Sequence, residues 1–158
     1  MKCVALIPAA GQGKRMGGAH SKPYLLLEGK PILAHTLLEL ERCPLIHEVV
    51  LTVESGEVER ARASVVEAFR LQKVGAVLAG GVQRQDSVWE GLRTVQDDCD
   101  LVMVHDGVRP FISQEMLARS IQGAIDCGAG IAAVPAKDTV KLVSDQHMVL
   151  KTPDRKSV

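Results

Sequence analysis

The 158-residue sequence has few aromatic residues, since only 3% of its positions are Phe, Trp or Tyr. Its core must therefore be built from Val, Leu, Ile and Ala, which suits a sheet covered by helices better than a β-sandwich. The sequence also lacks a surplus of either charge, because 19 basic and 19 acidic residues cancel. A nucleic-acid binder usually carries a basic surplus, so we expect no nucleic-acid partner. Any phosphate chemistry must then depend on cations that the fold places locally.

Cysteine motifs and long apolar runs are also missing. The four cysteines show no C-x-x-C pair and no metal-finger spacing, which favours reduced, mostly buried thiols in a cytoplasmic protein. They are Cys3, Cys43, Cys99 and Cys127. No stretch approaches the length that spans a bilayer, so we expect no membrane partner. The apolar run near the start is short and has no cleavage site behind it, which argues against a signal peptide.

The sequence does contain an alternation of apolar runs and amphipathic stretches, which is typical of α/β proteins. The predicted strands are residues 3–7, 46–53, 74–78, 100–104 and 130–134. The predicted helices are 31–43, 57–70, 84–94 and 113–126, the last with Ser113 as N-cap. Two short strands, 139–143 and 148–152, would form a hairpin near the end. The pattern predicts one α/β domain over residues 1–158 with a three-layer, mostly parallel, Rossmann-like sheet. In such sheets ligands bind beyond the carboxyl ends of the strands.

The loop after the first predicted strand, Pro8 to Met16, is rich in small residues and carries two cations. Small residues let the backbone approach a phosphate chain closely. The loop is not a dinucleotide fingerprint, because its third glycine comes one residue late, and it is not a P-loop, because Arg15 follows Gly13-Lys14. Lys22 precedes a proline, which biases its backbone toward an extended form beside this loop. A tight turn without a ligand and a solvated lysine are the alternatives.

Two further loops follow predicted strands. Gly80 to Ser87 joins a glycine turn to a helix start, so its backbone groups could read a pyrimidine edge, or it could simply cap the helix. Asp106 follows the fourth strand, where a carboxylate could hold Mg²⁺ beside a triphosphate or cap a turn. Arg109 offers a guanidinium suited to phosphate. His105 is favoured as a structural histidine.

The order and spacing of six motifs resemble the 2-C-methyl-D-erythritol 4-phosphate cytidylyltransferase family, the CTP-using enzymes of the non-mevalonate isoprenoid pathway. The motifs are Pro8–Met16, Ser21–Tyr24, Gly80–Ser87, His105–Pro110, Asp138–Lys141 and Thr152–Arg155. The resemblance implies a nucleotidyltransferase fold and transfer of CMP from CTP to methylerythritol phosphate, with Mg²⁺ as cofactor. Alternatives are a ribitol 5-phosphate cytidylyltransferase, which usually has a different first loop, and an inactive CTP-binding or dimerisation module.

The resemblance also implies roles for individual residues. Arg15 and Lys22 would stabilise the charge that develops at the α-phosphoryl group. The nucleotide contacts would be Ala9, Ala10, Gly11, Gly13, Gly81, Val82, Ser87 and Gly107, although Val82 departs from the acidic residue frequent at its position. Asp106 would hold the metal. The substrate-side residues would be Asp106, Arg109, Thr139 and Arg155.

Residues 137–155 would form the family's β-arm, which carries Thr139 and Arg155 to the partner subunit of a homodimer. Chains of the family continue past the Thr152–Arg155 motif. The resemblance therefore implies that the C-terminal part of the family domain is absent from these 158 residues. For that reason we expect weak or no turnover from this chain, although it encodes most of the nucleotide pocket.

Overall fold

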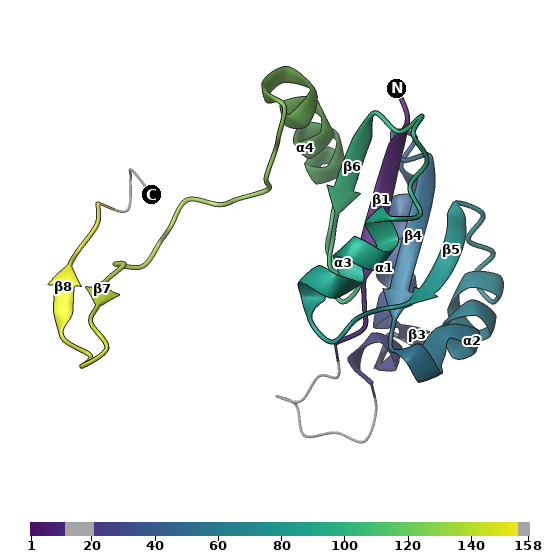
Figure 1. Ribbon diagram of the computed structural model, residues 1–158, viewed down its shortest axis with the longest axis horizontal. Helices are drawn as coiled ribbons and strands as arrows, with labels where there is room; N and C mark the ends of the chain where they lie inside the picture. The colour runs from purple at the N-terminus through teal and green to yellow at the C-terminus, as the bar shows by residue number, and fades with distance from the viewer. Residues whose placement is uncertain (12–20, 155–158) are drawn as a thin grey trace.

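A computed structural model describes residues 1–11 and 21–154, and a parallel β-sheet forms its centre (Figure 1). The sheet has four strands in the order β5-β4-β1-β6, and every neighbouring pair is parallel. The strands are β1 (Cys3–Pro8), β4 (Glu48–Val53), β5 (Val74–Ala79) and β6 (Leu101–Val104). These four strands confirm the strands predicted at 3–7, 46–53, 74–78 and 100–104.

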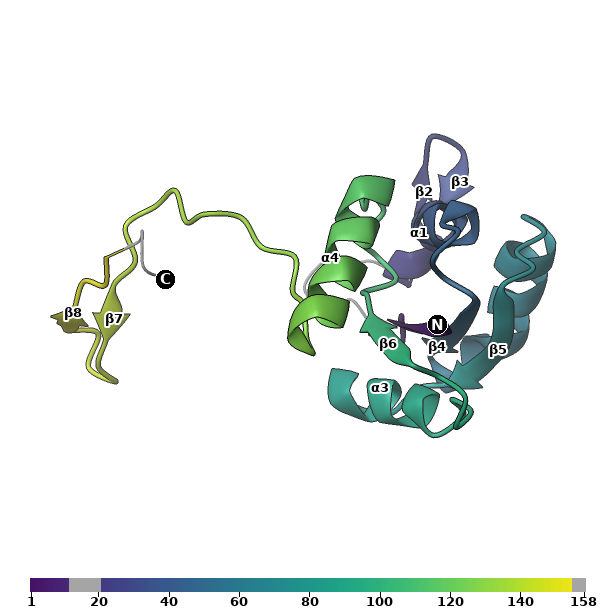
Figure 2. The same ribbon diagram turned by 90° about the horizontal axis from the view of Figure 1, so that it is seen from above.

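Helices cover both faces of this sheet, as Figure 2 shows from above. The helices are α1 (Ile32–Arg42), α2 (Val58–Ala61) with a π-helical continuation (Arg62–Glu67), α3 (Arg84–Leu92) and α4 (Gln114–Cys127). Side chains of α1, α2 and α4 pack in one core with Ala5 and Ile7, whereas Val88 of α3 packs on Val4 and Leu6. Successive residues of a strand point to opposite faces, and here both faces are covered, so all of β1 is buried. The predicted three-layer α/β architecture is confirmed.

Local capping explains where the helix after β6 begins and ends. The Ser113 hydroxyl oxygen accepts a hydrogen bond from the Met116 backbone N–H at 3.2 Å, which confirms Ser113 as the N-cap of α4. Gly128 follows the helix with a φ of 83°, a left-handed conformation that glycine adopts without strain. No helix within residues 1–11 and 21–154 is long and apolar enough to cross a bilayer.

The strand predicted at residues 130–134 is wrong. This segment is irregular, and Ile131 and Val134 are 90% and 85% exposed. Its apolar composition matches a buried strand, but a strand also needs a neighbour to hydrogen-bond. In the described part of the chain β6 pairs only with β1, and the segment leaves the sheet after α4 (Figure 1).

Two small hairpins complete the fold. The first joins β2 (Leu26–Leu27) to β3 (Lys30–Pro31) and was not predicted from the sequence. Its turn uses Gly29 at a φ of 77°. The second joins β7 (Leu142–Val143) to β8 (Val149–Lys151), so the predicted C-terminal hairpin is confirmed with shorter strands. Figures 1 and 2 show this second hairpin standing apart from the sheet at the end of an extended segment.

A substitution at Gly107, just after β6, would show how tightly the loops at the carboxyl ends of the strands pack. A Cβ added there would lie 2.9 Å from Ala9 Cβ and 3.0 Å from Leu33 Cδ1. We expect Gly107→Ala to lower the free energy of unfolding by about 1–3 kcal/mol, because the core cannot accommodate the methyl group without shifting. Gly123→Ala is the control, since its Cβ would meet no atom within 4 Å in the middle of α4. Urea unfolding that ranks Gly123→Ala as the more damaging change would contradict this account.

Candidate active site

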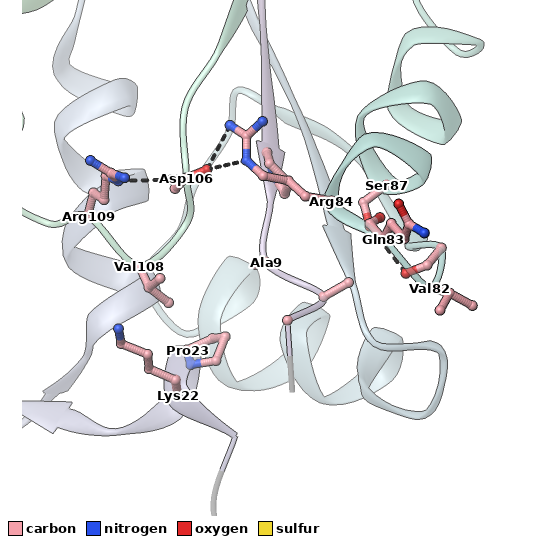
Figure 3. Close-up of a pocket in the computed structure, with 14 residues that line it drawn as sticks. Ala9, Lys22, Pro23, Val82, Gln83, Arg84, Ser87, Asp106, Val108 and Arg109 are labelled. Atoms are coloured by element: carbon pink, nitrogen blue, oxygen red, sulfur yellow. Dashed lines mark hydrogen bonds and ion pairs between the residues drawn. The ribbon is translucent and has the colours of Figure 1, made fainter. Parts of the chain in front are cut away.

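A pocket of ≈ 570 Å³ opens at the carboxyl ends of β1, β5 and β6 (Figure 3). This is the edge of a parallel sheet at which ligands of α/β proteins bind. Three separate strand-end loops and the segment after the first loop supply its walls. The lining residues are Pro8, Ala9, Ala10, Gly11, Lys22, Pro23, Gly81, Val82, Gln83, Arg84, Ser87, Asp106, Val108 and Arg109.

Close backbone packing holds the first loop against its neighbours. The Ala9 backbone N–H donates to Thr52 O at 2.7 Å, and the Gly107 N–H donates to Pro8 O at 3.1 Å. A Cβ on Gly80 would lie 2.5 Å from Ala10 Cβ, so only glycine permits the approach of the loop after β5 to the loop after β1. The two loops therefore form one continuous wall of small residues, over which an extended phosphate chain could lie close to the backbone.

Lys22 is held beside this wall by its neighbours in the chain. It begins a short 3₁₀ helix, Lys22–Tyr24, in which Pro23 and Tyr24 are buried. The Arg60 guanidinium lies 4.1 Å from the centre of the Tyr24 ring, and the Tyr24 hydroxyl donates to Glu57 O at 3.4 Å. This anchoring places the Lys22 side chain in the lining, where Figure 3 shows it rising toward Val108. An ammonium in the lining of this pocket suits electrostatic stabilisation of a phosphate group.

Asp106 lies across the pocket and is paired with two arginines. Its Oδ1 accepts a hydrogen bond from Arg84 Nε at 2.8 Å and forms an ion pair with Arg84 Nη2 at 2.8 Å, and its Oδ2 accepts from Arg109 Nε at 2.8 Å. Burial raises the pKa of Asp106, but the hydrogen bonds and charges of Arg84 and then Arg109 outweigh burial and lower this pKa below its ordinary value. The carboxylate is therefore ionised at neutral pH. Sequence reasoning did not assign a role to Arg84, although it lies within the Gly80–Ser87 motif.

The lowered pKa of Asp106 predicts a pH-dependent difference in stability from Asp106→Asn. A carboxyl whose pKa is lower in the folded chain stabilises that chain above its unfolded pKa, and the effect is lost as pH falls through the folded pKa. The wild-type chain should therefore unfold at higher urea concentration than Asp106→Asn at pH 7. The difference should shrink below pH 3.8, the ordinary pKa of this carboxyl.

Exposed Asp97, which is outside the pocket lining, provides the control for that experiment. Asp97→Asn should unfold at the same urea concentration as the wild-type chain at each pH from 3 to 7. A difference between wild type and Asp106→Asn that grows on acidification would contradict the ion-pair interpretation.

The start of α3 forms the wall opposite Lys22. Ser87 is buried, and its hydroxyl donates to Gln83 O at 3.3 Å, while Asp86 Oδ2 accepts from the Gln83 N–H at 2.9 Å. The motif is thus a capped helix start that also lines the pocket. The Val82 side chain is fully exposed, and Val82 is one of the residues that line the pocket.

Some residues named from the sequence are not part of this pocket. Gly107 packs beneath it without lining it. Thr139 lies on the extended segment before β7, away from the sheet (Figure 1). Gly13, Arg15 and Arg155 lie outside the described residues. His105 Nε2 is 3.1 Å from Arg109 O, which agrees with the structural role favoured for this histidine.

The acidic side chains in and around the pocket decide how a metal ion could be held there. Asp106 is the single acidic side chain among its lining residues, and residues 1–11 and 21–154 contain no cluster of three or more His, Cys, Asp or Glu side chains able to hold a metal. Mg²⁺ commonly takes one or two carboxylates together with phosphate oxygens of a bound nucleotide. Asp106 therefore fits Mg²⁺ when a triphosphate supplies further ligands, whereas the protein alone offers few.

Comparison with known proteins identifies the relatives of this fold and site. The family described as "IspD: 2-C-methyl-D-erythritol 4-phosphate cytidylyltransferase" matches residues 3–158. The chain belongs to this family. The 2-C-methyl-D-erythritol 4-phosphate cytidylyltransferase of Geotalea uraniireducens is 48% identical over 160 residues, which cover 100% of this chain and 68% of that protein. The protein of the same name from Alkaliphilus oremlandii is 46% identical over 154 residues, which cover 98% of this chain.

Solved structures of the family share the fold. The crystal structure of 4-diphosphocytidyl-2C-methyl-D-erythritol synthase from Anaerococcus prevotii superposes with a TM-score of 0.84 at 34% identity, covering 99% of this chain and 65% of that one. The Francisella tularensis 2-C-methyl-D-erythritol 4-phosphate cytidylyltransferase superposes with a TM-score of 0.77 at 29% identity, covering 100% of this chain and 68% of that one. The matched region spans 65% of the length of the Alkaliphilus oremlandii relative.

Proposed function

We propose that this chain carries the CTP site of a cytidylyltransferase that transfers CMP from CTP to 2-C-methyl-D-erythritol 4-phosphate with release of pyrophosphate, for isoprenoid precursor synthesis. One observation carries the proposal: Lys22, Asp106 and two arginines share one pocket with a wall of close-packed small residues. Membership of the IspD family supports the same activity.

The proposed reaction needs alignment and charge stabilisation more than a chemical nucleophile from the protein. A phosphate oxygen of methylerythritol phosphate attacks the α-phosphorus of CTP, and the bond from that phosphorus to the pyrophosphate oxygen breaks. The attacking phosphate is already ionised, so no general base has to remove a proton. Lys22 would stabilise the charge that grows on the α-phosphoryl oxygens, together with Arg15, which the resemblance pairs with it. Arg109 would orient the substrate phosphate.

The wall formed by the start of α3 would contribute base selectivity. Backbone groups of Gly81 and Val82 and the region around buried Ser87 lie where a base could be read at close range. An added Cβ at Gly81 would lie 2.2 Å from Asp86 Cβ, so only glycine lets this loop pack so closely on the start of α3. As the cytidylyltransferase family to which the chain belongs implies, a pyrimidine should bind there in preference to a purine.

Mg²⁺ is proposed as the cofactor, held by Asp106 and by phosphate oxygens of CTP. When bound, it would neutralise part of the triphosphate charge and so favour departure of pyrophosphate. The protein's own contribution is to keep the Asp106 carboxylate ionised, which the two neighbouring arginines do.

We also propose a cytoplasmic homodimer in which residues 137–155 act as an interlocking arm. The apolar side chains of the β7–β8 hairpin are half or more exposed within one chain, and an isolated two-stranded hairpin is only marginally stable in water. A partner subunit would cover these side chains and would receive Thr139 and Arg155 at its substrate site. Thr139 is not among the residues that line the pocket of its own chain, which is consistent with a role in the partner.

Calorimetry with nucleotides tests the function directly. We expect the 158-residue chain to bind CTP with Mg²⁺ more tightly than ATP, because it belongs to a cytidylyltransferase family. Methylerythritol phosphate should then bind to the CTP complex in preference to ribitol 5-phosphate. Failure to bind CTP would overturn the proposal, and preference for ribitol 5-phosphate would favour the alternative substrate.

A further inference from the structure

Arg84 occupies a position in the pocket to which the family resemblance assigns no role. It is the first residue of α3, and its guanidinium reaches across to the loop after β6, 22 residues away in the sequence (Figure 3). Two of its nitrogens, Nε and Nη2, lie 2.8 Å from the same Asp106 oxygen, Oδ1. Arg109 takes the other oxygen, Oδ2. Both oxygens of the one carboxylate in the lining are therefore occupied by guanidinium groups.

This arrangement conflicts with metal binding by the protein alone. A divalent cation would have to approach Asp106 between two positive charges, and it would have to displace an existing hydrogen bond. The Asp106 side chain is 25% exposed, but those of Arg84 and Arg109 are 61% and 73% exposed. Ion pairs whose cationic partner is this exposed are weak and exchange readily. The two arginines therefore compete with a cation for the Asp106 carboxylate, but they can be displaced from it.

A bound triphosphate would change this balance in two ways. Its negative charge would attract the Arg84 guanidinium, whose ion-pair partner among the described residues is Asp106, and its phosphate oxygens would provide the ligands that a cation needs. Arg84 is better placed to move than Arg109. Arg109 lies three residues from Asp106 on the same turn, where its backbone N–H also donates to Asp106 O at 3.1 Å. Arg84 comes from a separate element and contacts this loop through its side chain.

We infer that Arg84 is a displaceable counter-ion that occupies Asp106 until nucleotide and metal bind together, and that it then transfers to the triphosphate. This inference rests on the proposed CTP site. Arg84 acts as a positioning residue. In the nucleotide-free chain it orients the Asp106 carboxylate through the ion pair and disfavours binding of a metal ion without nucleotide. Nucleotide and cation then enter as one unit, since each removes an obstacle to the other.

The test compares Arg84→Ala with the wild-type 158-residue chain, using Mn²⁺ alone as the probe and electron paramagnetic resonance to count free ion. Without nucleotide, Arg84→Ala should bind Mn²⁺ about fivefold more tightly than wild type, because Oδ1 of Asp106 is no longer occupied. In metal-free calorimetry the same variant should bind CTP about tenfold more weakly, because it has lost a cation for the triphosphate. The opposite signs of these two changes are the signature of exchange.

Matched variants separate exchange from a general effect on structure. Arg93→Ala removes an arginine from the end of the same helix whose ion pair is with Glu90, and both affinities should stay as in wild type. Adding Asp106→Asn to Arg84→Ala should abolish the gain in Mn²⁺ affinity. Arg84→Lys keeps the positive charge but lacks the planar guanidinium with its several N–H donors. Its affinities for Mn²⁺ and for CTP should therefore lie between those of wild type and Arg84→Ala. If Arg84→Ala does not fold, as judged by its thermal unfolding, Arg84→Lys carries the comparison.

Two results would overturn the inference while leaving the proposed function in place. One is Mn²⁺ affinity unchanged or weakened in Arg84→Ala although wild type binds CTP. The other is a metal-free CTP affinity that is equal in the two chains. A wild-type chain that binds no CTP at all would instead overturn the proposed function.

Discussion

Replacing Lys22 with alanine should weaken CTP binding by about 10- to 100-fold, since one charge-assisted contact to phosphate is lost. The loss should be this large because the lysine is held in the pocket by its surroundings. Pro23 and Tyr24 are buried, and Arg60 stacks on the Tyr24 ring, so the backbone that carries Lys22 does not have to be ordered when the ligand binds. In any measurable turnover the effect should be greater, about 100- to 1,000-fold, because charge on the α-phosphoryl group grows in the transition state.

Lys30→Ala is the matched control for this prediction. Lys30 is an exposed lysine in β3, close to Lys22 in the sequence but outside the pocket lining. Calorimetry with CTP and Mg²⁺ should give the wild-type affinity for Lys30→Ala. Equal losses in the two variants would mean that overall charge, and not the placement of Lys22, governs nucleotide binding.

The second large effect is expected at the C-terminal hairpin. Val149 and Leu150 are neighbours in β8, so their side chains point to opposite faces, and they are 58% and 70% exposed. If the hairpin is the arm of a dimer, the double variant Val149→Asp with Leu150→Asp should weaken self-association about 100-fold or more. Two apolar side chains that are buried at the dimer contact would then be replaced by buried carboxylates without partners. Sedimentation equilibrium of wild type and variant measures this change.

A charge-matched variant isolates the apolar contribution of the hairpin. Lys151→Glu alters the net charge by the same two units as the double variant but leaves the apolar side chains of β8 in place. It should change the dimer constant much less. A double variant that associates as tightly as wild type would show that the hairpin is not the dimer contact.

The sequence predicted the elements whose pattern reflects burial on both faces of a sheet. The continuous apolar run at 3–7 and the largely apolar segment at 46–53 became β1 and β4 because helices cover both sides. The same reasoning failed for 130–134, where the apolar run has no strand to pair with. Composition reports what a segment could bury, whereas pairing depends on which edge of the sheet is available.

For the pocket, the sequence by itself determined which residue types stand at the ends of strands: small residues after β1, glycines after β5 and an acidic residue after β6. Only the tertiary structure decided that Arg84 meets Asp106. Arg84 follows β5 and Asp106 follows β6, and these two strands lie at opposite edges of the sheet. The two residues meet because α3 packs across one face of the sheet and contacts β1. Local propensity acts over a few residues, but this ion pair depends on strand order, which is set by the packing of the whole domain.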